Sequence, residues 1–227
     1  GKVARLKPKY GFAEFDSAKG VSLKTIPDAM NEYEKMANML QNNGINCNFA
    51  PVVDLAVNPN NKVIVGLERS FGASPQKVAK YAKILIDAQK KAGVISVLKH
   101  FPGHGSSLGD SHLGFVNITD TWSEKELEPY IELIKTNSVD MIMTAHVFNS
   151  KLDPKYPATL SYNVNTKLLR EKLGFNGVIV SDDLQMRAIS KHYTLKQTVT
   201  LAINGGVDIL LFGNQLAEQN LDELIEI

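Results

Sequence analysis

The chain has 227 residues, of which 44% are hydrophobic and 22% are charged, and its formal net charge is +1. This composition is typical of a globular domain with a sizeable core, and the small net charge excludes a bulk field that would attract nucleic acid. No apolar run is long enough to span a membrane, and the single Cys47 excludes an intrachain disulfide and a cysteine-rich metal site.

Predicted strands and helices alternate along the chain. A strand-like start at residues 1–6 precedes a helix that begins near Ile26-Pro27 and ends at Gly44. The later strands are predicted as continuous apolar runs at 46–53, 94–98, 140–144, 177–180 and 208–212. A helical pattern follows each of them, at 76–91, 123–136, 165–172, 194–204 and 217–225. Two helix starts carry signals: Ser74-Pro75 opens the first, and Ser123 with Glu126 predicts a capping box.

Alternating buried strands and helices fit either an open doubly wound sheet or a (β/α)8 barrel. Polar residues follow nearly every predicted strand: Asp54, Lys99-His100, His146, Asp182-Asp183 and Asn214. Because a barrel gathers all strand ends in one mouth, this pattern favours an α/β fold of the (β/α)8 TIM type. No Gly-x-Gly-x-x-Gly follows a strand, which disfavours a dinucleotide site. Only five or six strands fit, so we expect an incomplete barrel with N-terminal strands outside this chain.

The polar stretch 99–112 follows the strand at 94–98 and contains three His, one Lys and one Asp. His112 is a candidate for proton transfer, because histidine titrates near neutrality, and Asp110 could orient its ring. The alternative is an exposed loop histidine. Glycine and serine residues at 103–109 predict a hinge that lets Asp110 and His112 move while Lys99 and His100 stay fixed.

Asp182 directly follows the apolar strand at 177–180. In a barrel this position places a carboxylate at the floor of the mouth, where it can attack an electrophilic carbon. The alternative is a structural aspartate that caps the next helix, a role that Ser181 or Asp183 could fill equally well.

Two other strand-end residues have alternative interpretations. We expect Lys99 to pair with a carboxylate, to bind a substrate hydroxyl, or to do both, because a buried lysine is rarely tolerated without a partner. His146 is either a structural hydrogen-bonding residue or a residue that lines the barrel mouth. Four histidines also raise a metal-dependent barrel hydrolase as an alternative, although the sequence contains neither His-x-His at a strand end nor His-Glu-x-x-His on a helix.

Seven short segments, in order along the whole chain, resemble glycoside hydrolase family 3, and more closely its β-N-acetylglucosaminidase branch. The segments are NFAPVxD (48–54), ERSFG (68–72), KHFPGHG (99–105), DSH (110–112), TAHV (144–147), PATLS (157–161) and SDDLxM (181–186). The resemblance implies that residues 1–227 are a part of the family's N-terminal catalytic barrel domain. It also implies an enzyme that needs no cofactor or metal.

The resemblance assigns roles to individual residues. Asp182 matches the nucleophile that forms a covalent glycosyl-enzyme, and His112 matches the acid/base, with Asp110 as its partner. Arg69, Lys99 and His100 match sugar-binding positions. Arg5 is a further sugar-binding candidate, because Gly1-x-Val3-x-Arg5 resembles the end of the family's Asp-Gln-Glu-Gly-Gly-x-Val-x-Arg segment.

The expected function is a retaining exo-β-N-acetylglucosaminidase that acts on a small N-acetylglucosamine-containing glycan or muropeptide. No nucleic-acid partner and no membrane span are expected, and a bacterial cytoplasmic location is favoured over the periplasm or cell surface. A metal-dependent barrel hydrolase and a non-catalytic sugar-binding module are the alternatives. Transfer of the sugar to phosphate instead of water also stays open, because a histidine base repels an anionic acceptor less than a carboxylate does.

Overall fold

The computed structural model describes residues 6–109 and 116–213. Its main sheet is parallel and consists of β1 (Cys47–Asn48), β2 (Ile95–Phe101), β4 (Met141–Thr144) and β6 (Val178–Val180), in that spatial order. Ile209 adds a parallel bridge to β6. The spatial order within the main sheet therefore equals the chain order, whereas a doubly wound sheet reverses at a switch point. This order confirms the predicted α/β barrel type.

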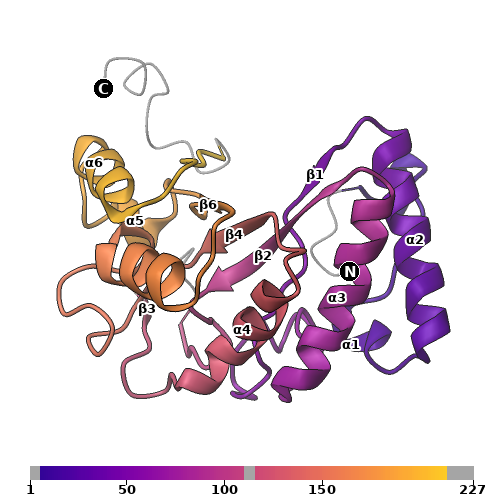
Figure 1. Cartoon of the computed structure of the whole chain (residues 1–227), viewed down its shortest axis with the longest axis horizontal. Coiled ribbons are helices and arrows are strands. Elements are labelled where there is room, and N and C mark those ends of the chain that lie inside the picture. Colours follow the sequence, from indigo (N-terminus) through magenta and orange to yellow (C-terminus); the bar gives the residue numbers. More distant parts are fainter. Residues whose placement is uncertain (1–5, 110–115, 214–227) are drawn as a thin grey trace.

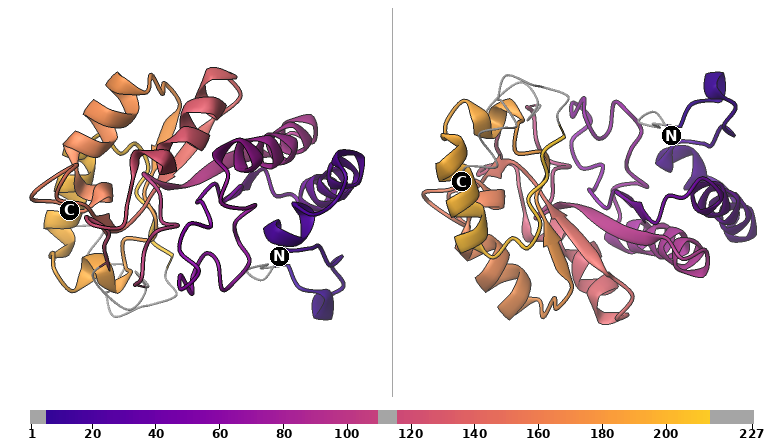
Figure 2. Two further views of the ribbon diagram at one scale, coloured as in Figure 1. Left: turned by 90° about the horizontal axis from the view of Figure 1, so that it is seen from below. Right: turned by 90° about the horizontal axis from the view of Figure 1, so that it is seen from above.

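Five longer helices lie along one side of the sheet and alternate with its strands in chain order, beginning with a helix before β1 (Figures 1 and 2). They are α2 (Ile26–Asn42), α3 (Pro75–Lys91), α4 (Glu128–Lys135), the π-helix η4 (Asn163–Lys172) and α6 (Leu195–Gly205). Short elements link them: η1 (Pro8–Tyr10), α1 (Ala18–Val21), η2 (Glu124–Leu127), η3 (Ala158–Leu160), α5 (Arg187–Ser190) and the strand pair β3 (Val116–Asn117) and β5 (Val147–Phe148).

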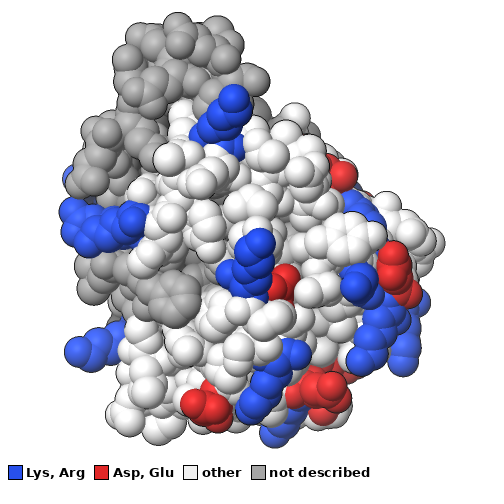
Figure 3. All heavy atoms as spheres, turned by 90° about the vertical axis from the view of Figure 1, so that its left-hand side faces the viewer, with Lys and Arg blue, Asp and Glu red and all other residues white. Residues whose placement is uncertain are grey.

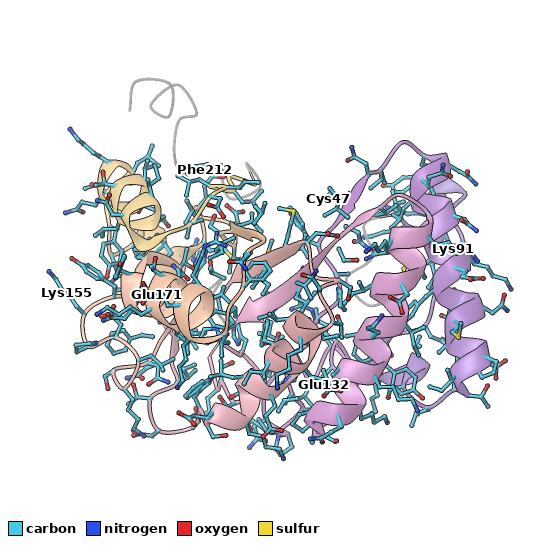
Figure 4. All side chains as sticks on the ribbon, in the orientation of Figure 1. Cys47, Lys91, Glu132, Lys155, Glu171 and Phe212 are labelled. Carbon is cyan, nitrogen blue, oxygen red and sulfur yellow. The ribbon has the colours of Figure 1, made fainter. Side chains whose placement is uncertain are left out.

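The two faces of the sheet have separate cores. Leu98, Ile142 and Ile179 lie side by side on β2, β4 and β6 and pack into the main core beneath the helices. On the opposite face Val97, Met143 and Val180 form a smaller cluster with Cys47, Met141 and Leu211 (Cys47 is labelled in Figure 4). Alternate residues of each strand therefore face the helices and the barrel interior, and the polar strand ends lie at the carboxyl edge between them.

Several sequence-based boundaries change. In the strand predicted at 46–53, only β1 and Val52 pair with β2. The pairing is interrupted at Pro51, which has no N–H to donate to the neighbouring strand. The strand predicted at 208–212 is reduced to the bridge at Ile209. The helix predicted at 217–225 and most of the strand at 1–6 lie outside the described residues.

The predicted capping box at Ser123 and Glu126 is wrong. Ser123 accepts no capping hydrogen bond with its side chain, and the helix predicted at 123–136 divides into η2 and α4. Glu126 is buried instead of reaching back to the backbone of Ser123. The caps at Ser74 and Thr194 do form, and Thr194 builds a capping box with Gln197.

Charged side chains are scattered over the face that Figure 3 shows, and basic residues lie beside acidic ones in several places. This distribution agrees with the net charge of +1 and forms no strip of a single sign on that face. Helices α3, α4 and η4 turn exposed charged residues such as Lys91, Glu132 and Glu171 away from the sheet (Figure 4). None of the helices in the described part of the chain is long and apolar enough to cross a membrane.

Candidate active site

The polar residues predicted at the strand ends are brought together at the carboxyl edge of the sheet. Asp54 follows β1, His100 lies near the end of β2, His146 follows β4 and Asp182 follows β6. Asp54, His100 and His146 are all at most 5% exposed, and Asp182 is half-buried. The parallel sheet thus collects two carboxylates and two imidazoles in one largely dehydrated region.

Asp54 organises the end of β2. Its Oδ2 lies 2.7 Å from His100 Nδ1, and its Oδ1 accepts the backbone N–H groups of His100 and His104 at 3.2 and 2.8 Å. Burial alone raises the pKa of Asp54, but the two histidines and their N–H groups outweigh it, and the net pKa is lowered. Burial also dominates at His100 and lowers its pKa to about 4, although Asp54 opposes the shift. At neutral pH the pair is therefore a carboxylate and a neutral imidazole.

The hydrogen bond to Asp54 fixes which nitrogen of His100 carries the proton. Nδ1 donates to the carboxylate, so Nε2 is the acceptor, and it lies 3.4 Å from Arg69 Nη2. Two of the predicted sugar-binding residues, Arg69 and His100, are thus in contact. Lys99 is half-buried beside them, and its charge is felt by Asp182.

His146 is held at both ring nitrogens. Nε2 lies 2.8 Å from the carbonyl oxygen of Asp183, so Nε2 carries a proton and donates it. Nδ1 lies 2.8 Å from Thr159 Oγ1, which in turn accepts from Thr144 Oγ1 at 2.9 Å. Burial lowers the pKa of His146 despite the opposing charge of Asp182. His146 therefore fixes the backbone beside Asp182 and is neutral at pH 7.

The hydrogen bonds give the two adjacent aspartates, Asp182 and Asp183, different roles. Asp183 is structural, because its Oδ1 accepts the N–H groups of Gln185 and Gly213 at 3.0 and 3.1 Å. Ser181 is structural as well, since its Oγ accepts the N–H of Leu211 at 2.9 Å. The next helix, α5, has no side-chain cap at its start, so the capping alternative considered for Asp182 is wrong, and its two neighbours hold the surrounding backbone instead.

Asp182 is poised to act as an anion. Burial raises its pKa, but the basic side chains of His146, His100 and Lys99 and the N–H of Asp183 outweigh burial, and the net pKa is lowered. That N–H donates to Oδ1 at 2.8 Å. A carboxylate that stays ionised in a partly dehydrated site can attack an electrophilic carbon, which is the chemistry expected of a glycosidase nucleophile.

The stretch after β2 is held far more firmly than its glycines and serines predict. Asn61 Nδ2 donates to the carbonyl oxygens of His104 and Gly105 at 2.8 and 3.1 Å, and Asn58 Nδ2 donates to those of Ser106 and Ser107 at 3.2 and 3.1 Å. All residues from 103 to 107 are buried. The expected hinge is therefore wrong for 103–107, because this segment is a fixed continuation of β2, and exposure begins only at Leu108 and Gly109.

Three predicted site residues, Arg5, Asp110 and His112, lie outside the described residues. Sequence reasoning missed two buried groups, the Thr159 hydroxyl that meets His146 and the carboxylate of Glu126, which it placed only in a capping box. The spacing of Glu126 from the apolar Tyr130 and Leu133, four and seven residues later, was a signal that Glu126 faces the core. Within the described ranges no group of three or more His, Cys, Asp or Glu side chains is arranged to hold a metal.

Comparison with known proteins agrees with this geometry. Residues 10–227 match the family model described as the glycosyl hydrolase family 3 N terminal domain. Beta-hexosaminidase A of Pseudoalteromonas piscicida is 42% identical over 182 residues, which are 74% of this chain and 30% of that protein. Beta-hexosaminidase LpqI of Mycobacterium tuberculosis is 34% identical over 220 residues, which are 93% of this chain and 56% of that protein. The chain thus spans between about a third and about half of these relatives.

Solved structures give the same answer. The β-N-acetylhexosaminidase of Beutenbergia cavernae superposes with a TM-score of 0.86 at 28% identity, covering 91% of this chain and 63% of that one. A family 3 β-N-acetylglucosaminidase from a Paenibacillus species superposes with a TM-score of 0.79 at 38% identity, covering 86% and 37%. Since the family model matches nearly the whole chain, the chain belongs to glycosyl hydrolase family 3 and carries the N-terminal domain of that family.

Proposed function

We propose that the protein is a retaining exo-β-N-acetylglucosaminidase that releases terminal N-acetylglucosamine from peptidoglycan fragments. The observation that carries the proposal is the state of Asp182, an anionic carboxylate at a strand end, surrounded by His146, His100 and Lys99. The names of the relatives support the reaction class, because they are β-hexosaminidases.

In the proposed first step Asp182 attacks the anomeric carbon of the sugar. The bond from that carbon to the glycosidic oxygen breaks, and the imidazolium of His112 gives its proton to the departing oxygen. In the second step neutral His112 takes a proton from water. The water oxygen attacks the same carbon and releases Asp182, so that one water is consumed and the configuration is retained.

The remaining side chains position the substrate. Arg69 and His100 are in contact, and the Asp54 carboxylate fixes the His100 ring, so these groups present a preset arrangement of donors and acceptors to sugar hydroxyls. We propose that Lys99 and Arg5 complete this subsite. Asp110 orients the His112 ring in the same way that Asp54 orients His100.

The test is turnover of a 4-nitrophenyl N-acetyl-β-glucosaminide, compared with the matching β-glucoside and with a muropeptide. The intact protein should prefer the N-acetylated substrate and release N-acetylglucosamine from the muropeptide. Asp182→Asn should abolish turnover, whereas Asp120→Asn, at an exposed turn, should leave it unchanged. Binding without turnover by the wild type would support a sugar-binding module instead, and loss of activity on dialysis against a chelator would support a metal-dependent hydrolase.

A further inference from the structure

Glu126 is a buried carboxylate that the proposed chemistry does not use. It lies in η2 and is 2% exposed. Its Oε2 accepts the backbone N–H groups of Gly105 and Ser106 at 2.9 and 3.3 Å. The preceding N–H, that of His104, goes to Asp54 Oδ1 at 2.8 Å. Three successive backbone N–H groups, those of residues 104–106, therefore donate hydrogen bonds to two buried carboxylates, Asp54 and Glu126.

The packing around Glu126 is equally close. Gly103 has a φ of +122°, and a Cβ added there would lie 2.6 Å from Glu126 Cβ, so a side chain would collide with it. Trp122, four residues earlier and outside the short helix, donates from Nε1 to the carbonyl oxygen of Pro102 at 3.0 Å. The segment 122–126 thus packs against residues 102–106 and hydrogen-bonds to their backbone. Asn58 and Asn61 donate to the carbonyl oxygens of residues 104–107.

We propose that Glu126 is a positioning residue for catalysis: by binding the N–H groups of Gly105 and Ser106, it fixes the segment from which the chain continues to the acid/base pair Asp110 and His112. The inference rests on the proposed function. The segment 103–107 lies between the sugar-binding His100 and that pair in the sequence. If its backbone shifts, proton delivery to the glycosidic oxygen is affected, whereas the proposed nucleophile Asp182, which follows β6, is not.

The role requires an acceptor rather than a charge. Burial raises the pKa of Glu126 to about 7, with the charge of Asp54 adding to the shift and the Ser106 hydroxyl and the two N–H groups opposing it. Tyr130 is the other titratable group that faces Glu126, and burial likewise raises its pKa. A glutamine has the same shape and retains an acceptor oxygen, so Glu126→Gln preserves the function that Glu126→Ala removes.

The test uses two N-acetyl-β-glucosaminides with different leaving groups. A dinitrophenolate departs without help, whereas an alkoxide must be protonated as the bond breaks. The value of kcat/KM reports the step that forms the glycosyl-enzyme, so the ratio of the two kcat/KM values measures assistance by the acid. The variants are Glu126→Ala, Glu126→Gln and the matched control Glu124→Ala, an exposed glutamate in the same short helix.

We expect Glu126→Ala to lose about tenfold more kcat/KM on the alkyl glycoside than on the dinitrophenyl glycoside, a part of the 10²–10⁴-fold that acid–base catalysis supplies. Glu126→Gln should stay within about twofold of wild type on both, and Glu124→Ala should be unchanged. Rates are taken per folded molecule, measured by circular dichroism. If Glu126→Ala does not fold, Glu126→Asp, which withdraws the carboxylate by one methylene, should show the same selective loss.

Equal losses of kcat/KM on the two substrates in Glu126→Ala would overturn the inference, because a purely structural role of Glu126 would lower the two kcat/KM values by the same factor. A loss in Glu126→Gln as large as in Glu126→Ala would also overturn it. In both cases the wild type is active and the proposed function stands. A wild type that hydrolyses neither glycoside would instead refute the proposed function and the inference with it.

Discussion

The Asp54 carboxylate and the His100 imidazole form a buried pair in which Oδ2 and Nδ1 are 2.7 Å apart. The pair joins two strand ends that are 46 residues apart in sequence, and the same carboxylate also binds the N–H of His104. One buried residue therefore sets both the proton position on His100, a proposed sugar-binding residue, and the start of the segment that leads to the proposed acid/base. Its removal should affect binding and stability together.

Asp54→Asn is predicted to raise KM for the N-acetylglucosaminide and to lower the free energy of unfolding by about 1–3 kcal/mol. The amide can accept from the backbone N–H groups only if its NH₂ faces His100 Nδ1. That contact moves the imidazole proton to Nε2, opposite the Arg69 guanidinium. Nitrogen-15 chemical shifts of the histidine ring identify the tautomer. An unchanged tautomer together with an unchanged KM would show that Asp54 does not orient His100.

His146→Gln is predicted to weaken the loss of stability in acid. The ordinary pKa is 6.5 and burial lowers that of His146, so the unfolded chain binds the proton more readily than the folded one. The stabilisation that the neutral ring contributes is present above pH 6.5 and is lost as the pH falls through the lowered value. Urea unfolding at pH 7.5 and pH 5 should show wild type losing more stability than the variant. Equal losses would contradict a buried neutral His146.

Glu126→Gln is predicted to have the opposite pH dependence. Burial raises the pKa of Glu126 from 4.5 to about 7, so its folded form favours the proton. The associated stability is present below pH 4.5 and is lost as the pH rises through 7. The melting temperature of the glutamine variant relative to wild type should therefore be higher at pH 8 than at pH 5. The Glu124→Gln control should show no such trend, and a flat difference for Glu126→Gln would place the carboxylate in water.

Gly105→Ala is predicted to lower the free energy of unfolding by at least about 2 kcal/mol. A Cβ at Gly105 would lie 1.8 Å from the Leu55 carbonyl oxygen, and this backbone must move to admit it. Gly93→Ala is the control, because Gly93 has a φ of +72° with nothing within 4 Å and should cost only about 1 kcal/mol for its left-handed backbone. Similar losses in the two variants would show that the 103–107 segment yields easily.

Local patterns predicted the elements whose cause is local. The helices α2, α3 and α6 end or begin where their caps and apolar spacing place them, and the buried strands carry the continuous apolar runs of a parallel sheet. Because the carboxyl ends of parallel strands meet at one edge, the sequence also predicts that Asp54, His100, His146 and Asp182 lie together. These predictions depend only on periodicity and on the geometry that all parallel sheets share.

Errors arose where distant residues decide the outcome. Glu126 matches a capping box in sequence, but its carboxylate accepts the N–H groups of Gly105 and Ser106, which are 21 and 20 residues earlier. The glycines after β2 suggest mobility, yet Gly103 and Gly105 are required by close approach of Glu126 and Leu55. Position after a strand does not distinguish Asp182 from Asp183, whereas the hydrogen bonds of Asp183 to Gln185 and Gly213 show that Asp183 is the structural residue. No local pattern contains this information.

The proposed mechanism requires Asp182 as the nucleophile. The direct measurement is mass spectrometry of the protein after incubation with a 5-fluoro N-acetylglucosaminyl fluoride, in which fluorine slows release of the glycosyl-enzyme. We predict one added sugar on the peptide that contains Asp182, retained in Asp120→Asn and lost in Asp182→Asn. Labelling of a different residue, or hydrolysis of the N-acetylglucosaminide without any adduct and undiminished in Asp182→Asn, would contradict the account.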